Sequence, residues 1–142
     1  MRSNLPVTNI ETPFPDGQII VSQTDLEGNI IYANDTFIQM SGFTWEELRG
    51  QPHNIIRHPD MPSVAFKILW STIKSGFPWE GIVKNRRKDG GFYWVSALIV
   101  PIFHNRKISG YLSVRTKASK AKITEAEKLY ARLREGKASL RS

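Results

Sequence analysis

The segment NRRKDG, from Asn85 to Gly90, followed by Tyr93-Trp94-Val95 and Pro101, decides the fold of this chain. It predicts two strands joined by a tight turn. Counting along the first strand with a period of two places Trp79 and Asn85 on one face and the charged side chains up to Lys84 on the other. The Trp79 face is therefore expected to be the inward one, so that the amide of Asn85 points into the interior.

An inward amide at Asn85 needs hydrogen-bond partners, because a buried polar group without them costs about 1–3 kcal/mol. Two interpretations follow from this. Either nearby backbone groups satisfy the amide, or the amide meets the polar edge of a bound ligand.

The length of 142 residues indicates one domain with at most a short appended segment. The absence of cysteine excludes disulfides, thiolate nucleophiles and cysteine-ligated metal clusters. No apolar run approaches the roughly 18–20 residues that span a bilayer, and the N-terminus has no signal-peptide pattern. We therefore expect a soluble chain that does not insert into the membrane.

The net charge of +7 is unevenly distributed. Residues 117–142 carry eight Lys and Arg against three Glu, which assigns +5 to this segment and leaves +2 for the rest. A nucleic-acid-binding domain would be basic along its whole surface, so we expect no nucleic-acid partner. The cluster of Lys84, Arg86, Arg87 and Lys88 is either a solvated hairpin tip or a site for a phosphate or an acidic partner.

The order of predicted elements indicates an α+β fold in which a five-stranded antiparallel sheet carries helices on one face. A cavity between the sheet and these helices is the expected ligand site. The predicted elements are an extended N-terminal cap (1–18), strands at 19–24 and 29–33, a helix capped by Asn34, a short helix from Thr44 to Gly50, an irregular loop (51–62), a helix at 63–75, and strands at 79–87, 92–103 and 107–116.

A last amphipathic helix is predicted within residues 117–142, where Thr124 and Glu127 have the spacing of a capping box. Ile123, Ala126 and Tyr130 recur on one side of it. The helix either packs on its own domain or connects the domain to a further segment. We favour the connector.

Few catalytic constellations are available to this chain. No serine or threonine stands out beside His58 and Asp60, as a hydrolase would require. A metal site at His53, His58 and Asp60 is conceivable, although a proline-rich loop positions such side chains poorly. The sequence has no glycine-rich phosphate-binding loop at the start of a helix. Trp70, Trp79 and the Arg57-His58 pair could instead surround one cavity. Flat aromatic rings, cations and an inward amide suit a planar heteroaromatic ligand with a phosphate attached, although each residue could equally be part of the core or a surface ion pair.

Several strings resemble known sequences. Ile31 to Phe37 (IYANDTF), Ser41-Gly42-Phe43 and Glu47 to Gly50, with the Lys88 to Pro101 stretch, resemble a PAS domain across roughly residues 19–116. More narrowly, GQPHNIIRHPDMP (50–62), PWEGIVKNRRKDG (78–90) and KISGYLSVRT (107–116) are similar to the cytoplasmic sensor domains of bacterial aerotaxis receptors.

That resemblance implies a PAS fold that binds FAD without a covalent bond and reports redox state to a chemotaxis signalling complex. Asn85 is similar to the strand asparagine that meets the flavin ring in this family. His53 stands where light-sensing members carry an adduct-forming cysteine, which excludes their photochemistry here. The implied cofactor-binding residues are Asn34, His53, Arg57, His58, Asp60, Trp70, Trp79 and Asn85.

The resemblance also implies partners and a location. The family's full-length proteins continue into a membrane anchor, a HAMP domain and a signalling coiled coil, so residues 117–142 would begin a linker toward them. We expect a homodimeric cytoplasmic sensor. Its full-length protein would attach it to the bacterial inner membrane and couple it to the chemotaxis kinase complex. We do not expect an enzyme. The alternatives are a PAS module that binds another small molecule or only dimerises, and a fragment of a flavin-dependent redox enzyme.

Overall fold

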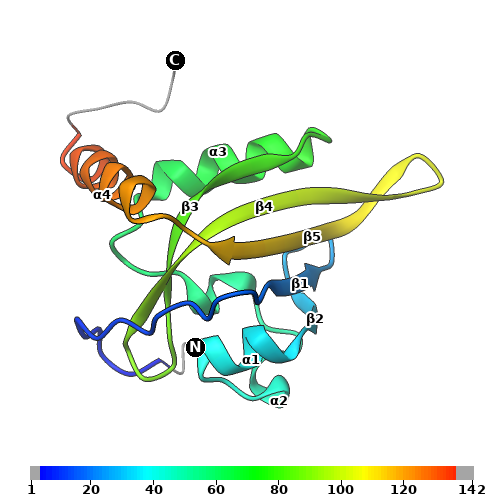
Figure 1. The fold of residues 1–142 in the computed structure, drawn as a ribbon. Helices are drawn as coiled ribbons and strands as arrows, with labels where there is room; N and C mark the ends of the chain where they lie inside the picture. Colours follow the sequence, from blue (N-terminus) through cyan, green and yellow to red (C-terminus); the bar gives the residue numbers. More distant parts are fainter. Residues whose placement is uncertain (1–3, 137–142) are drawn as a thin grey trace.

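The computed structural model describes residues 4–136. One antiparallel sheet with the strand order β2-β1-β5-β4-β3 forms its centre (Figure 1). This confirms the predicted α+β fold with a five-stranded antiparallel sheet. In chain order the elements are β1 (Ile20–Thr24), β2 (Ile30–Ala33), α1 (Asp35–Ser41), α2 (Trp45–Leu48), the 3-10 helix η1 (His53–Ile56), α3 (Ser63–Lys74), β3 (Trp79–Arg86), β4 (Phe92–His104), β5 (Lys107–Lys117) and α4 (Lys120–Arg134).

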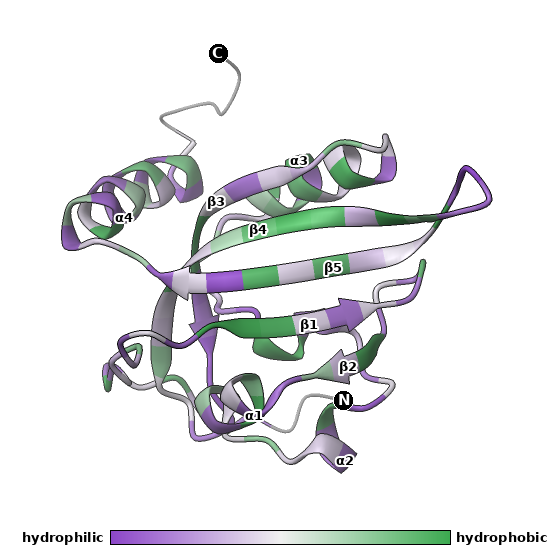
Figure 2. Cartoon of the chain, turned by 45° about the vertical axis from the view of Figure 1, so that its right-hand side comes forward, coloured by the Kyte–Doolittle hydropathy of each residue, from purple (hydrophilic) through white to green (hydrophobic). Residues whose placement is uncertain are grey.

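The register of the strands gives the sheet two different faces. Asn85 pairs with Tyr93, Ala97 with Arg115, and Ile20 with Arg115, so these residues share the inner face. Lys84 pairs with Trp94 on the outer face. The inner face is covered by α1, α2, η1 and α3, and Figure 2 shows that β4 is hydrophobic along much of its length. The largest enclosed core residues include Tyr93, Phe37, Phe43 and Leu48.

The short helices begin where their capping residues predict. The Asn34 side chain accepts a hydrogen bond from the backbone N–H of Phe37, and Gly42 ends α1 in the left-handed conformation. Thr44 and Glu47 form the predicted reciprocal capping box of α2. The irregular loop at 51–62 contains only the single turn of η1, as its prolines require.

Helix α4 packs on its own domain, against the outer face of the sheet opposite the other helices (Figure 1). Ala126 and Tyr130 are buried there, and the Tyr130 hydroxyl donates a hydrogen bond to the carbonyl oxygen of Ile82 at 2.5 Å. The predicted capping box at Thr124 is wrong. The helix begins five residues earlier, where the Ser119 side chain accepts from the N–H of Lys122. Thr124 donates its hydroxyl to the carbonyl of Lys120.

The N-terminal segment runs along the β3–β4 hairpin rather than away from the domain. The backbone N–H groups of Leu5, Thr8 and Thr12 donate to the carbonyls of residues 88, 90 and 92. Asn4 donates its amide both to the Ile55 carbonyl at 3.1 Å and to the Arg87 carbonyl at 3.2 Å. The segment therefore ties the hairpin to η1.

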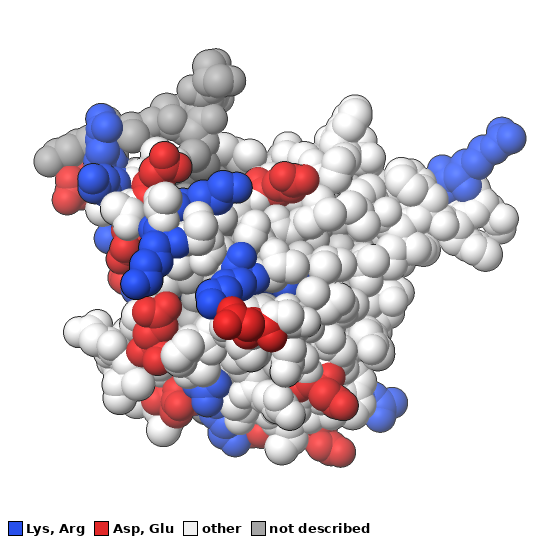
Figure 3. Space-filling view, in the orientation of Figure 1, with Lys and Arg blue, Asp and Glu red and all other residues white. Residues whose placement is uncertain are grey.

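Charges are not spread evenly over the surface. Figure 3 shows Lys and Arg intermingled with Asp and Glu on the left-hand and lower parts of this view. The middle of the area over β4 and β5 is largely uncharged, while the tip of their hairpin at the right is basic. Side chains that reach this outer face from the two strands include Leu98, Val100, Leu112 and Val114.

Candidate functional site

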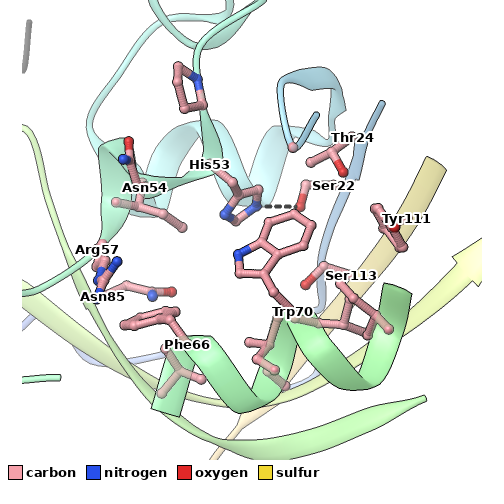
Figure 4. A pocket seen from close by; sticks show the side chains of 18 of the residues that line it. Ser22, Thr24, His53, Asn54, Arg57, Phe66, Trp70, Asn85, Tyr111 and Ser113 are labelled. Carbon is pink, nitrogen blue, oxygen red and sulfur yellow. Dashed lines mark hydrogen bonds between the residues drawn. The ribbon is translucent and has the colours of Figure 1, made fainter. Parts of the chain in front are cut away.

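A cavity of about 300 Å³ lies between the inner face of the sheet, η1 and α3 (Figure 4). This volume is at the lower end of the roughly 300–1,000 Å³ of small-molecule sites. Its wall is largely apolar and carries a few polar groups, which is the usual character of a ligand site. The lining residues are Ser22, Thr24, Glu27, Gly28, Pro52, His53, Asn54, Ile56, Arg57, Phe66, Leu69, Trp70, Ile73, Val83, Asn85, Ala97, Ile99, Tyr111, Ser113 and Arg115.

Asn85 lines this cavity from β3, as its position on the inner face predicts. Only 4% of the residue is exposed, and its Oδ1 atom has no hydrogen-bond partner within the chain. The backbone of Asn85 forms a bridge with that of Arg57, which fixes the strand beside the loop that follows η1. Because an unsatisfied buried oxygen costs about 1–3 kcal/mol, the geometry favours a ligand donor at this atom.

A chain of hydrogen bonds crosses the cavity wall from β5 to η1. Arg115 donates to the Oγ of Ser22 at 2.8 Å, and Ser22 Oγ lies 3.0 Å from His53 Nε2 (Figure 4). The Ser22 hydroxyl accepts from Arg115 and pairs with His53 Nε2 as donor or acceptor according to the tautomer of the imidazole. Burial, followed by the charge of Arg115, lowers the pKa of His53 to about 3. His53 is therefore neutral near pH 7, and its ring stacks on Phe37.

Arg115 is a buried cation with 2% of its surface exposed. Burial lowers its pKa to about 10, so it remains charged at neutral pH. Its guanidinium lies 4.3 Å from the centre of the Phe37 ring, and its Nε atom has no hydrogen-bond partner within the chain. A buried cation of this kind favours a ligand that brings oxygen or nitrogen acceptors into the cavity.

Trp70 forms one side of the cavity from α3. Its ring makes an edge contact with Tyr111 of β5, with ring centres 5.5 Å apart. It also lies close to Gly28, where an added Cβ atom would come within 2.9 Å of the indole. Gly28 has a φ of +84°, so both its conformation and the neighbouring indole favour glycine at this position.

Arg57 and Phe66 stand beside one another at the wall between α3 and the preceding loop. The Arg57 guanidinium lies 3.9 Å from the centre of the Phe66 ring, which is a cation–π arrangement. Arg57 also lines two further surface hollows outside the cavity. It is therefore placed to contact both a ligand in the cavity and any part of that ligand that extends to the surface.

The structure brings four of the eight predicted cofactor-binding residues together around the cavity, namely His53, Arg57, Trp70 and Asn85. The other four do not line it. Asn34 caps α1 and donates to the Ile19 carbonyl. The Trp79 ring lies over Gly81 of the same strand, within the core.

His58 and Asp60 lie beyond Arg57, along the free edge of β3. His58 is enclosed, while the carboxylate of Asp60 is half exposed and pairs with Lys84 at 2.9 Å. The Lys84 partner is the largest cause of a lowered pKa at Asp60. These two side chains therefore belong to a different part of the surface from the cavity.

Sequence reasoning missed the polar residues that β1 and β5 contribute, above all Arg115, Ser22 and Ser113. The signal was available, because Tyr111, Ser113 and Arg115 alternate along β5 and share its inner face. An arginine at an inward strand position, like the inward Asn85, indicates a functional site.

Membrane-spanning helices and metal-binding clusters are both absent from the described residues. Within 4–136 no helix is both long enough and apolar enough to span a membrane. The same residues contain no group of three or more His, Asp or Glu side chains that could hold a metal ion, and this includes His53, His58 and Asp60.

Comparison with known proteins gives a consistent assignment. A family model described as the PAS fold matches residues 30–115. The chain is 52% identical over 141 residues to the aerotaxis receptor of Escherichia coli (strain K12), which covers 99% of this chain and 28% of that protein. It is 30% identical to the nitrogen fixation regulatory protein of Klebsiella oxytoca over 73% of this chain and 21% of that protein. The chain thus spans less than a third of these relatives.

Among solved structures, the dark state of the blue-light photoreceptor Aureochrome1 LOV superposes with a TM-score of 0.67 at 20% identity, covering 84% of this chain and 86% of that one. This likeness concerns the fold. Together with the matched family model and the sheet order, it shows that the chain belongs to the family of PAS-fold domains.

Proposed function

We propose that this chain is an FAD-binding redox sensor domain that acts in aerotaxis. The observation that carries the proposal is the unpartnered Oδ1 of Asn85 in the wall of a cavity that also holds Arg115 and Trp70. The cavity volume suits the ring system of a flavin rather than a whole dinucleotide. The 52% identity to the aerotaxis receptor supports the same role.

The residues of the cavity fit such a ligand. Asn85 and Arg115 offer an amide and a guanidinium to the polar edge of a planar ring, and Trp70 and Phe66 offer flat apolar surfaces. His53, which is neutral and is held by Ser22 and Phe37, excludes water from the wall without adding a charge. The proposed contacts are therefore those of His53, Arg57, Trp70, Asn85 and Arg115.

The proposed signal is a change of hydrogen bonding at Asn85. A bound flavin supplies a ring nitrogen that accepts a hydrogen bond when oxidised and donates one when reduced and protonated. The Asn85 side chain can answer by rotating, so that its oxygen replaces its NH₂ group at the ligand. A mismatched buried hydrogen bond costs about 1–3 kcal/mol, enough to bias a two-state domain roughly 5–150-fold.

The proposed route of the signal leads from Asn85 through β3 to α4. Asn85 and the backbone of Arg57 are bridged, and β3 carries α4 on its other face. In this proposal α4 passes the change to a HAMP and signalling region of the full-length protein, and through it to the chemotaxis kinase complex, in a homodimer at the inner membrane. The domain senses and does not turn over a substrate.

The visible spectrum of the purified domain tests the proposal. Bound flavin gives a yellow protein whose absorption bleaches with dithionite under anaerobic conditions and returns with air. A protein that stays colourless after incubation with excess FAD refutes it and favours the alternative, a PAS module that binds another ligand or only dimerises. Steady consumption of NAD(P)H by the isolated domain would favour a redox enzyme instead.

A further inference from the structure

A second hollow, of about 650 Å³, opens at the surface between the loop after η1, the start of α3, the end of β3 and the end of α4. Three arginines from three different elements line it, namely Arg57, Arg86 and Arg134, and we call it the arginine cleft. Its described lining contains no Asp or Glu. The carboxylate of the neighbouring Asp60 is paired with Lys84.

His58 provides the strongest indication of a ligand here. It lines the arginine cleft with 1% of its surface exposed. Its Nδ1 accepts from the backbone N–H of Asp60 at 3.0 Å, which places the imidazole proton on Nε2. Nε2 is buried and has no partner within the chain. The site therefore has an N–H donor that lacks its acceptor.

The charge state of His58 agrees with that assignment. Burial, and then the charge of Lys84, lowers its pKa to about 4, while Asp60 acts in the opposite direction. The imidazole is thus neutral near pH 7 and offers one donor. A buried donor without a partner destabilises the folded protein, and an anionic acceptor in the cleft would satisfy it.

The other groups of the arginine cleft are donors as well. Arg86 donates to the Leu5 carbonyl at 2.8 Å, but its Nε is buried without a partner. Arg134 donates to the Asp60 carbonyl and retains further N–H groups. Helix α3 starts after Pro62 with no side-chain cap, so its first N–H groups and its dipole face the same hollow.

We propose that the arginine cleft binds phosphate, and that its occupant in the loaded protein is the pyrophosphate of the dinucleotide flavin. This inference rests on the proposed function. Arg57 lines both the cavity and the arginine cleft, so a ligand whose ring fills the cavity can reach the cleft past this residue. Arg134 belongs to α4, and the proposal therefore makes α4 part of the cofactor site.

The test compares FAD with riboflavin, which has the same ring system and no phosphate. Binding to the flavin-free protein is followed by flavin fluorescence. The wild type should bind FAD at least about tenfold more tightly than riboflavin, since hydrogen bonds to a charged phosphate are stronger than those between neutral groups. Arg86→Gln and Arg134→Gln should each weaken FAD about tenfold and leave riboflavin unchanged. The two residues lie on different elements, so a local packing defect in one variant does not explain both.

Lys128→Gln is the matched control, because it removes one positive charge from an exposed position on α4 that does not line the cleft. It should leave both affinities unchanged. Equal affinity of the wild type for FAD and riboflavin, or a parallel loss of both in the arginine variants, overturns the inference while the proposed function stands.

Inorganic pyrophosphate tests whether the arginine cleft binds the phosphate of FAD or that of a different ligand. If no flavin binds the wild type, the proposed function fails. Should pyrophosphate alone then raise the thermal unfolding temperature of the wild type but not of Arg86→Gln, the arginine cleft is a phosphate site that serves a ligand other than a flavin. No effect of pyrophosphate in that case refutes both proposals.

Discussion

Mild acid should destabilise the flavin-free domain through two imidazoles, that of the partly buried His53 and that of the enclosed His58. Their pKa values are lowered by burial to about 3 and about 4. An imidazole in an unfolded chain has a pKa of about 6.5. Between these values the unfolded state binds more protons than the folded one, so stability is fully present above about pH 6.5 and is lost as the pH falls.

The size of the effect follows from the shifts. At pH 5 an unfolded imidazole is almost fully protonated while the folded one is not, which costs about 2 kcal/mol for each residue and about 4 kcal/mol for both. Carboxylates contribute little in this window, because the pKa values of Asp25 and Asp60 are lowered and these groups stay ionised in the folded state. The pH range 5–7 therefore isolates the histidines.

Urea unfolding of the flavin-free protein at pH 7.5 and at pH 5 measures this difference. His53→Gln keeps a hydrogen-bonding group beside Ser22 and should remove about half of the loss. The double variant His53→Gln with His58→Gln should remove nearly all of it. A wild type equally stable at both pH values, or a double variant that keeps the full slope, would refute the reasoning about these two sites.

Three further predictions concern single positions. Asn85→Ala should retain much of the FAD but lose the redox-dependent difference in limited proteolysis that the wild type shows; a persisting difference would remove Asn85 from the signal. Gly28→Ala should weaken flavin binding, measured as flavin affinity, because the added Cβ meets Trp70. The control Gly17→Ala has a similar φ and open space around it, so it should lower the free energy of unfolding in urea by only the backbone strain of about 1–2 kcal/mol and leave flavin affinity unchanged. Ser119→Ala should speed hydrogen exchange in α4 by removing a cap contribution of about 1 kcal/mol, and Thr124→Ala should not; the reverse result would restore the capping box at Thr124.

The sequence predicted those parts of the fold that depend on local rules. The caps of α1 and α2 and the inward direction of Asn85 follow from side-chain chemistry and strand periodicity, and all are confirmed. The start of α4 was misplaced because two possible capping residues, Ser119 and Thr124, lie only five residues apart. Local pattern alone does not decide between them.

The cavity was only half predictable from the sequence. Asn85 and Trp70 are found from the periodicity of single elements. The Arg115–Ser22–His53 chain depends on three elements that meet only when β1 inserts between β2 and β5. The position of His58 depends on how the loop at 57–62 follows the edge of β3, and proline-rich loops carry no periodic signal for such a path.

The central place of β1 has a practical consequence for anyone designing a shorter protein. A piece trimmed to the matched residues 30–115 would discard β1, although this strand sits in the middle of the sheet between β2 and β5. Among the strands of residues 4–136, β2 pairs with β1 alone and would lose this neighbour. A long edge of β5 would also be open to pairing with other molecules. Such a fragment is expected to aggregate. If it failed to bind flavin, that result would not bear on flavin binding by the domain that includes β1.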